Sequence, residues 1–170
     1  MAQDGEYLEV DSTKYIVWDE DRPLTWDDYP VIGVDASPDF INNNALTAVT
    51  HSVRGGIVKG EPNFEVYVLF KIKDSWTTSR EDPQLFAHEK LHFDIAELYG
   101  RKLRKQIAAM GGQKVMNLSE YRRKIKFLLD EFKIKSMDYD EETGHGSLLD
   151  KQIEWQNFVS SEMQRLHKYK

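Results

Sequence analysis

The feature that most constrains the fold is a long segment with a strong start signal and a strong stop signal for a helix. No proline occurs between Gln84 and Met110, and Gly111-Gly112 follow as a stop. Asp82 and Pro83 stand directly before it, an N-cap residue followed by proline at the first helical position. We therefore predict one long helix from Pro83 to the glycine pair.

Two histidines lie on one face of this predicted helix. Residues four positions apart differ by about 40° around the axis, so the imidazoles of His88 and His92 project in the same direction, one turn apart. Ile95 and Tyr99 continue the same stripe, which places it towards the protein interior. Buried imidazoles need polar partners, and a metal ion is an economical one. The spacing predicts that His88 and His92 bind Zn²⁺.

Glu89 gives this segment the spacing H-E-x-x-H, which is typical of zinc peptidases. Its side chain lies about 100° from that of His88 around the helix, within reach of a water at the metal. In such sites the glutamate is the general base. The alternative is two solvated histidines and a surface glutamate, but solvated histidines would be expected on the outer faces with Lys90 and Arg101. We therefore take Glu89 as the candidate catalytic base.

A catalytic zinc commonly has three protein ligands, so a third is needed. Asp94 and Glu97 are close in sequence, but they point away from the metal face of an unbroken helix. His145 stands between Gly144 and Gly146, and glycines allow a backbone to approach a site closely. We predict His145 as the third ligand. The alternatives are Glu120 first, and then Asp138, Asp140 and Glu141.

The first half of the chain predicts strands. Expected strands span 15–18, 45–53 and 64–73, the second ended by Arg54-Gly55-Gly56 and the third preceded by a turn at 61–63. In 64–73 apolar residues alternate with residues of mixed polarity, which indicates a strand with one buried face.

The second half predicts two further helices. One is capped by Ser119, and the last runs from near Ser147 towards His167. Strands followed by helices indicate an α+β fold. We expect a mainly antiparallel N-terminal sheet and three helices, zincin-like, with the histidines on the first long helix and residues 1–170 forming a single domain.

Composition narrows the function classes. The 170 residues carry a net charge of −6, and the basic clusters fit the outer faces of helices, so nucleic-acid binding is not expected. No cysteine is present, which excludes thiolate zinc sites and a cysteine nucleophile. No apolar run is long enough to span a membrane. The first residues lack the features of a signal peptide, so we expect either a cytoplasmic protein or one whose leader has been removed.

Several segments together resemble a known family. They are Pro23–Tyr29, Ser75-Trp76, His88–Tyr99 and Tyr139–Gly146, followed by Gln152 and Trp155. In this order they resemble the bacterial family catalogued as domain of unknown function 922, whose members are predicted zinc-dependent peptidases. The resemblance implies a metallopeptidase-like domain that is often exported from the bacterial cytoplasm, so we expect a periplasmic or extracellular location.

The leading hypothesis is a zinc-dependent hydrolase that cleaves a peptide or protein substrate. Glu89 would take the proton of the attacking water, and Tyr139 or Tyr99 would donate a hydrogen bond to the oxyanion. The strand 64–73 would pair with an extended substrate if it lies at a sheet edge. The alternatives are a non-catalytic metal-binding module of an envelope assembly and a hydrolase of a non-peptide amide bond. The glutamate favours an enzyme, because a structural zinc site needs no base and is usually closed by four ligands.

Overall fold

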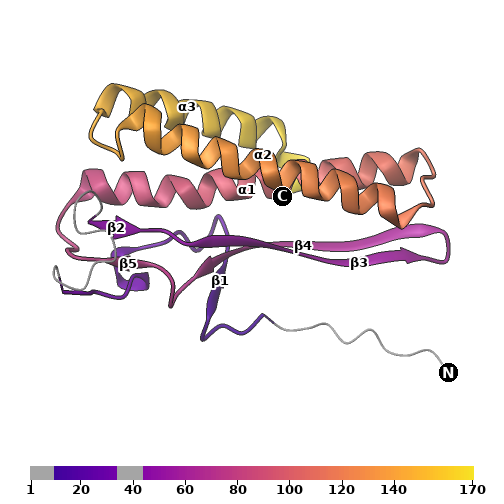
Figure 1. The fold of residues 1–170 in the computed structure, drawn as a ribbon, viewed down its shortest axis with the longest axis horizontal. Coiled ribbons are helices and arrows are strands. Elements are labelled where there is room, and N and C mark those ends of the chain that lie inside the picture. Colours follow the sequence, from indigo (N-terminus) through magenta and orange to yellow (C-terminus); the bar gives the residue numbers. More distant parts are fainter. Residues whose placement is uncertain (1–9, 34–43) are drawn as a thin grey trace.

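A computed structural model describes residues 10–33 and 44–170 and has an α+β fold, as predicted. The strands are β1 (Tyr15–Val17), β2 (Ala45–Leu46), β3 (Val49–Val58), β4 (Glu61–Lys71) and β5 (Trp76–Thr77). The α-helices are α1 (Pro83–Gly112), α2 (Leu118–Thr143) and α3 (Leu149–Arg165), and the short 3₁₀ helices are η1 (Trp26–Asp28) and η3 (His167–Tyr169). In Figure 1, α1 lies between the strands on one side and α2 and α3 on the other. The candidate metal-binding helix is therefore the central layer.

The strands form two small antiparallel sheets. The larger has the order β1-β4-β3, and the smaller pairs β2 with β5. β4 is therefore the central strand of the larger sheet, so the condition for substrate pairing by strand 64–73, a position at the sheet edge, is not met. β3 is an outer strand of the larger sheet and β2 is an outer strand of the smaller one, and the two follow each other along the chain.

Two predicted strand boundaries of the segment 45–56 are wrong. The expected strand 45–53 is divided into β2 and β3, and β3 continues through Gly55-Gly56 to Val58. Gly55 has φ 114°, and a Cβ there would lie 1.9 Å from the Asn63 carbonyl oxygen, so this glycine permits close pairing with β4. The chain reverses instead at Lys59-Gly60, where φ is 51° and 86°, a two-residue hairpin with both residues left-handed.

The helix starts follow from capping side chains. Asp82 accepts hydrogen bonds from the backbone N–H groups of Gln84 and Leu85 at 2.9 and 3.0 Å, as the predicted N-cap requires. α2 is capped by Asn117, whose side chain accepts from the Ser119 N–H at 2.9 Å, and not by Ser119 as predicted. Asparagine caps a helix as well as serine does, so the helix gains two residues at this end.

α1 is buried on two sides because it packs against both layers. Val68 and Phe70 of β4 pack against Phe93 and Ala96 on one side. A Cβ on Gly100 would lie only 2.5 Å from Val68 Cγ2, so the glycine permits the close approach of helix and strand. On the other side, an apolar cluster joins α1 to the two later helices; its buried members are Leu91, Ile95, Tyr99, Tyr139, Trp155 and Val159.

The two acidic residues that follow the histidines on α1 turn away from them, as their helical angles predict. Asp94 accepts a hydrogen bond from the indole N–H of Trp18 at 2.9 Å. Glu97 is buried and bonds both Arg101 and Arg104 at 3.0 Å. Among residues 10–33 and 44–170, no helix combines the length and apolar character that crossing a bilayer requires.

Candidate metal centre

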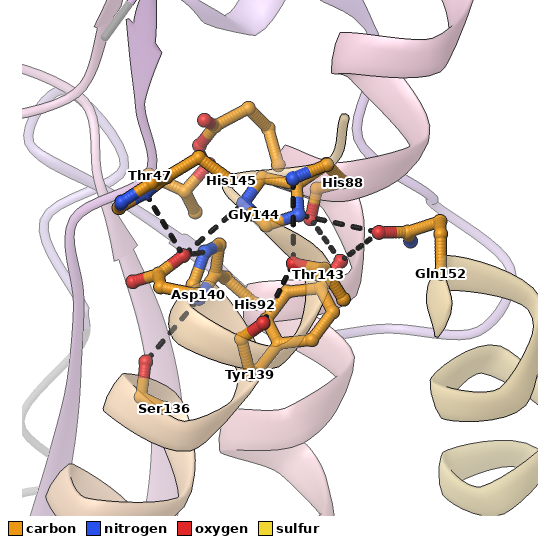
Figure 2. A network of polar contacts seen from close by, with 12 residues as sticks. Thr47, His88, His92, Ser136, Tyr139, Asp140, Thr143, Gly144, His145 and Gln152 are labelled. Atoms are coloured by element: carbon orange, nitrogen blue, oxygen red, sulfur yellow. Dashed lines mark hydrogen bonds and ion pairs between the residues drawn. The ribbon is translucent and has the colours of Figure 1, made fainter. Parts of the chain in front are cut away.

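Three side chains from two helices converge where α1 and α2 meet. His88 and His92 come from α1, and Asp140 comes from α2. The Nε2 atoms of the histidines lie 3.1 and 2.9 Å from Asp140 Oδ1 (Figure 2). All three ligand atoms lie within 4.8 Å of one another, close enough to share one metal ion.

The second nitrogen of each histidine is bonded to an oxygen of a neighbouring helix. His88 Nδ1 lies 3.2 Å from the amide oxygen of Gln152, and His92 Nδ1 lies 3.2 Å from the Ser136 hydroxyl. An amide oxygen only accepts, so the proton of neutral His88 is on Nδ1, and Nε2 presents its lone pair towards Asp140. Metal-binding histidines commonly have such outer partners, which fix the tautomer and the ring orientation.

Tyr139 supports His88 from beneath. Its ring stacks on the imidazole with centroids 4.6 Å apart, and its hydroxyl lies 3.0 Å from the His88 carbonyl oxygen and 2.8 Å from the Gln152 amide oxygen. Tyr139 is fully buried, and burial raises the pKa of its hydroxyl well above the usual range, so the group stays protonated. The Tyr139 hydroxyl is hydrogen-bonded to the His88 carbonyl oxygen and to Gln152. A hydrogen bond from Tyr139 to the oxyanion stays a prediction.

Asp140 is held in its ionised form. Burial alone would raise the pKa of this carboxyl group, but hydrogen bonds and charge from His88 and His92 lower the pKa well below its usual range. One carboxylate oxygen and two imidazole nitrogens form a donor set that suits Zn²⁺ and other divalent first-row metals. The residues present therefore fit a metal ion, although its identity does not follow from the donor set alone.

His145 lies at the rim of this cluster. Its side chain is 53% exposed, and its Nδ1 lies 3.8 Å from Asp140 Oδ1. The loop approaches the metal cluster, but the residue that lies against His88 is Gly146, where a Cβ would lie 2.7 Å from His88 Cβ. The Gly146 carbonyl accepts from the Gln84 side chain at 2.7 Å, which ties the loop to α1. Coordination by His145 stays a prediction.

Asp140, which the sequence analysis names after Glu120 among the alternatives for the third ligand, is the acidic residue that lies beside His88 and His92. Glu120, the first alternative, lies in the first turn of α2, and the rise of a helix separates it from Asp140 by about 30 Å. Asp138 lies 3.4 Å from Lys135 in a surface pair. Glu120 therefore cannot join this cluster.

Glu89 lies beside the same cluster and is held by a chain of hydroxyl groups. It is buried, and it lines a cavity of about 210 Å³ together with His88, His92 and Asp140. Its Oε2 accepts from the Thr47 hydroxyl at 2.6 Å, and the Tyr29 hydroxyl lies 2.8 Å from that of Thr47. Because Thr47 has one hydroxyl proton and gives it to Glu89, Tyr29 is the donor to Thr47.

Sequence reasoning missed this support of Glu89. Tyr29 ends the segment Pro23–Tyr29, for which no chemical role is predicted, and Thr47 lies between β2 and β3. Nothing local to either residue indicates contact with a carboxylate on α1. The one signal in the sequence was the place of Tyr29 in a segment that resembles a known family.

Strand β2 borders the cavity with an open backbone edge. The Thr77 N–H donates to the Pro30 carbonyl at 2.9 Å, and the Thr77 carbonyl accepts from the Ile32 N–H at 3.0 Å. Because Thr77 and Ala45 are antiparallel partners, and the backbone groups of Thr77 face away from β2, those of Ala45 face away from β5. Within the described residues, no strand pairs with this side of β2.

Comparisons with curated proteins and with solved structures give no match. The candidate ligands and Glu89 all fall inside the one stretch that matches a family. Residues 68–146 match the family described as "Bacterial protein of unknown function (DUF922)", which supports the resemblance seen in the sequence without assigning an activity.

Proposed function

We propose that this protein is a zinc-dependent hydrolase with a zincin-like fold, most simply a peptidase, in which His88, His92 and Asp140 hold the metal. The observation that carries the proposal is the position of Glu89, whose carboxylate lines the same cavity as the three donors. Bound zinc would supply a Lewis acid and lower the pKa of a coordinated water. Glu89 then takes the proton of the attacking water and passes it to the leaving nitrogen.

An open coordination position distinguishes a catalytic site from a structural one. Structural zinc sites are usually closed by four protein ligands, whereas catalytic sites have three and leave one position for water. Here three donors converge beside a cavity of about 210 Å³. This arrangement supports an enzyme.

The edge of β2 supports a peptide as the substrate. Ala45 lines the cavity and directs its N–H and C=O away from β5, so an extended chain can pair with it by β-strand addition. Such pairing recognises consecutive peptide groups, which a substrate with a single isolated amide does not offer. We therefore favour a peptidase over a hydrolase of a non-peptide amide.

A non-catalytic metal-binding module is the second candidate, and one observation favours it. His145 Nδ1 lies 3.8 Å from Asp140 Oδ1, so a small movement of this exposed ring would add a fourth ligand and close the site. The two candidates differ in how many protein ligands the metal keeps. They also differ in whether Glu89 is needed for any reaction.

Metal analysis and a cleavage screen test the proposal together. The purified protein should bind about one zinc ion per chain, the stoichiometry of one three-ligand site. A mixture of peptides should be cleaved by the zinc form, left intact after chelation, and cleaved again when zinc is restored. Zinc binding without cleavage of any peptide would favour the binding module. No zinc uptake at neutral pH would reject both candidates.

A further inference from the structure

A second groove, of about 470 Å³, lies between β3 and α2. Its apolar lining includes Val53 and Phe64 from the strands and Ile125 and Leu129 from the helix, while Arg122 and Lys133 are among its charged residues. Phe64 stacks on buried Tyr121, with ring centroids 5.1 Å apart. The groove therefore has an apolar floor and a partly basic rim.

The groove and the metal centre share one face of α2. Arg122, Ile125, Leu129 and Lys133 line the groove, and Ser136 and Asp140 continue this series, at the spacings of three and four that place residues on one helix face. The helical rise puts Leu129 about 16 Å, and Ile125 about 22 Å, from Asp140 along the axis. An extended chain spans these distances with about five to seven residues.

The β3 strand offers an open backbone edge beside this face. The Lys71 N–H donates to the Ala48 carbonyl at 2.8 Å, so every second residue from Ala48 onward bonds β4. The residues between, which include His51 and Val53, direct their N–H and C=O groups away from β4. In the part of the chain that the structure describes, no strand pairs with that side of β3.

The charge of the groove is opposite to that of the protein. The three cations in its lining are Arg122, Lys126 and Lys133, and the only anion is Asp130, which pairs with both lysines. Arg122 has no hydrogen-bond or ion-pair partner among the described residues. The chain as a whole carries a net charge of −6. A local excess of positive charge on an acidic protein favours an acidic occupant.

We propose that this groove is a second binding site for the substrate chain, and that it selects an extended polypeptide with an apolar residue flanked by acidic residues. The selected residues lie about five to seven positions from the bond at the metal centre. The chain would pair with the β2 and β3 edges, place its apolar side chain on Phe64 and Leu129, and set its carboxylates beside Arg122 and Lys133. This inference rests on the proposed peptidase function, but it makes a claim about binding that needs no catalysis.

The test measures peptide binding to metal-free Glu89→Gln protein, in which no cleavage occurs. The probes are fluorescein-labelled peptides of about twelve residues, the length that spans both sites, with alternating valine and threonine. One pair carries Glu-Leu-Glu near the amino or the carboxyl end, and a matched pair carries Lys-Leu-Lys. Fluorescence anisotropy should show that one acidic probe binds about tenfold more tightly than its lysine counterpart, with a preference that decreases as salt increases.

Charge reversal locates the site. The double variant Arg122→Glu/Lys133→Glu should abolish or invert the preference for the acidic probe. Lys124→Glu makes the same kind of change on an exposed position of α2 outside the groove, and it should alter affinity by less than about twofold, as expected for a distant surface charge. Equal affinity for the acidic and basic probes, or an equal effect of Lys124→Glu, would overturn the inference.

The result for peptide binding in the groove can be told apart from the result for zinc binding and cleavage. Preferential binding of the acidic probe by a protein that takes up no zinc would support the groove and reject the metal centre. Zinc uptake and peptide cleavage without any acidic preference would support the metal centre and reject the groove.

Discussion

The two halves of α1 both carry buried charged or polar side chains, but they differ in how these groups are satisfied. In the second half, the Glu97 carboxylate bonds Arg101 and Arg104, and these guanidinium groups also donate to carbonyl oxygens of Met163, Val66 and Tyr169. Donors and acceptors match there, and the network fastens α1 to β4 and to the C-terminal segment.

In the first half, the donors and acceptors do not match. Both nitrogens of His88 face acceptors, the Gln152 amide oxygen and the Asp140 carboxylate, so a neutral His88 can donate to only one of them, and His92 Nε2 faces the same carboxylate oxygen. Such an arrangement is unfavourable unless a cation or proton stands at its centre. Burial of charge therefore does not by itself indicate a functional site, whereas unmatched polar groups beside a cavity do.

The largest expected effect is on catalysis. Glu89→Gln should reduce peptide cleavage by about 10²- to 10⁴-fold, because the amide keeps the shape of the side chain but cannot take a proton. Zinc content, measured by elemental analysis, should stay at the wild-type level. Cleavage at the wild-type rate would show that Glu89 is not the base, and loss of zinc would place it in the coordination shell.

Glu97→Gln, in the other half of α1, should lower the stability of the fold and leave zinc binding unchanged. Removing the carboxylate leaves the buried guanidinium group of Arg101 and the partly buried one of Arg104 without their anion, so the free energy of unfolding should fall by about 3 kcal/mol. Zinc affinity of the folded variant should not change, since Glu97 lies on the far side of the helix from the histidines. A variant with normal stability and weakened zinc binding would break the distinction between the two halves.

A smaller effect on the rate is expected at Thr47. Thr47→Val removes the hydroxyl that donates to Glu89 at 2.6 Å, and should lower kcat by about tenfold, within the range of outer-shell changes, with little effect on KM. Thr47→Ser keeps the hydroxyl and should restore most of the rate. If serine and valine at this position behave alike, the hydroxyl does not position Glu89.

The smallest effect concerns His51, a partly buried histidine outside the metal centre. His51 Nε2 donates to the Ala96 carbonyl at 2.7 Å, and burial lowers the pKa of the imidazole. A lowered pKa means that the unfolded chain binds the proton first, so this contribution to stability is present above pH ~6.5 and is lost as the pH falls below it. Denaturant titrations of wild type and His51→Gln at several pH values should show a weaker acid dependence in the variant. Identical slopes would contradict this assignment.

The local part of the fold could be predicted from the sequence. The alternation in β4 and the Asp82-Pro83 start of α1 depend on neighbouring residues alone, and both were predicted. The division of β2 from β3 was not, because it depends on pairing with β5 and β4. Gly55 and Gly56 are typical of a strand end when the sequence is considered alone. In the structure both pair with β4, so the strand continues through them.

The same distinction holds within the site. His88, His92 and Glu89 share one helical turn and were predicted to act together from their spacing, and the structure places all three at one cavity. Asp140 was ranked low, because its approach depends on how α2 lies against α1, which no local pattern encodes. Gln152 and Ser136 were missed as partners of the histidines for the same reason.

Zinc titration of the purified protein shows whether His88, His92 and Asp140 converge on one metal ion. We expect about one zinc per wild-type chain, and for Asp140→Ala an affinity lower by more than about 100-fold, beyond the effect of losing an outer-shell contact. The far-ultraviolet circular dichroism spectrum should not change. His145→Ala, titrated in parallel, should weaken binding much less. Unchanged zinc affinity in Asp140→Ala, together with lost affinity in His145→Ala, would show that His145 and not Asp140 is the third ligand.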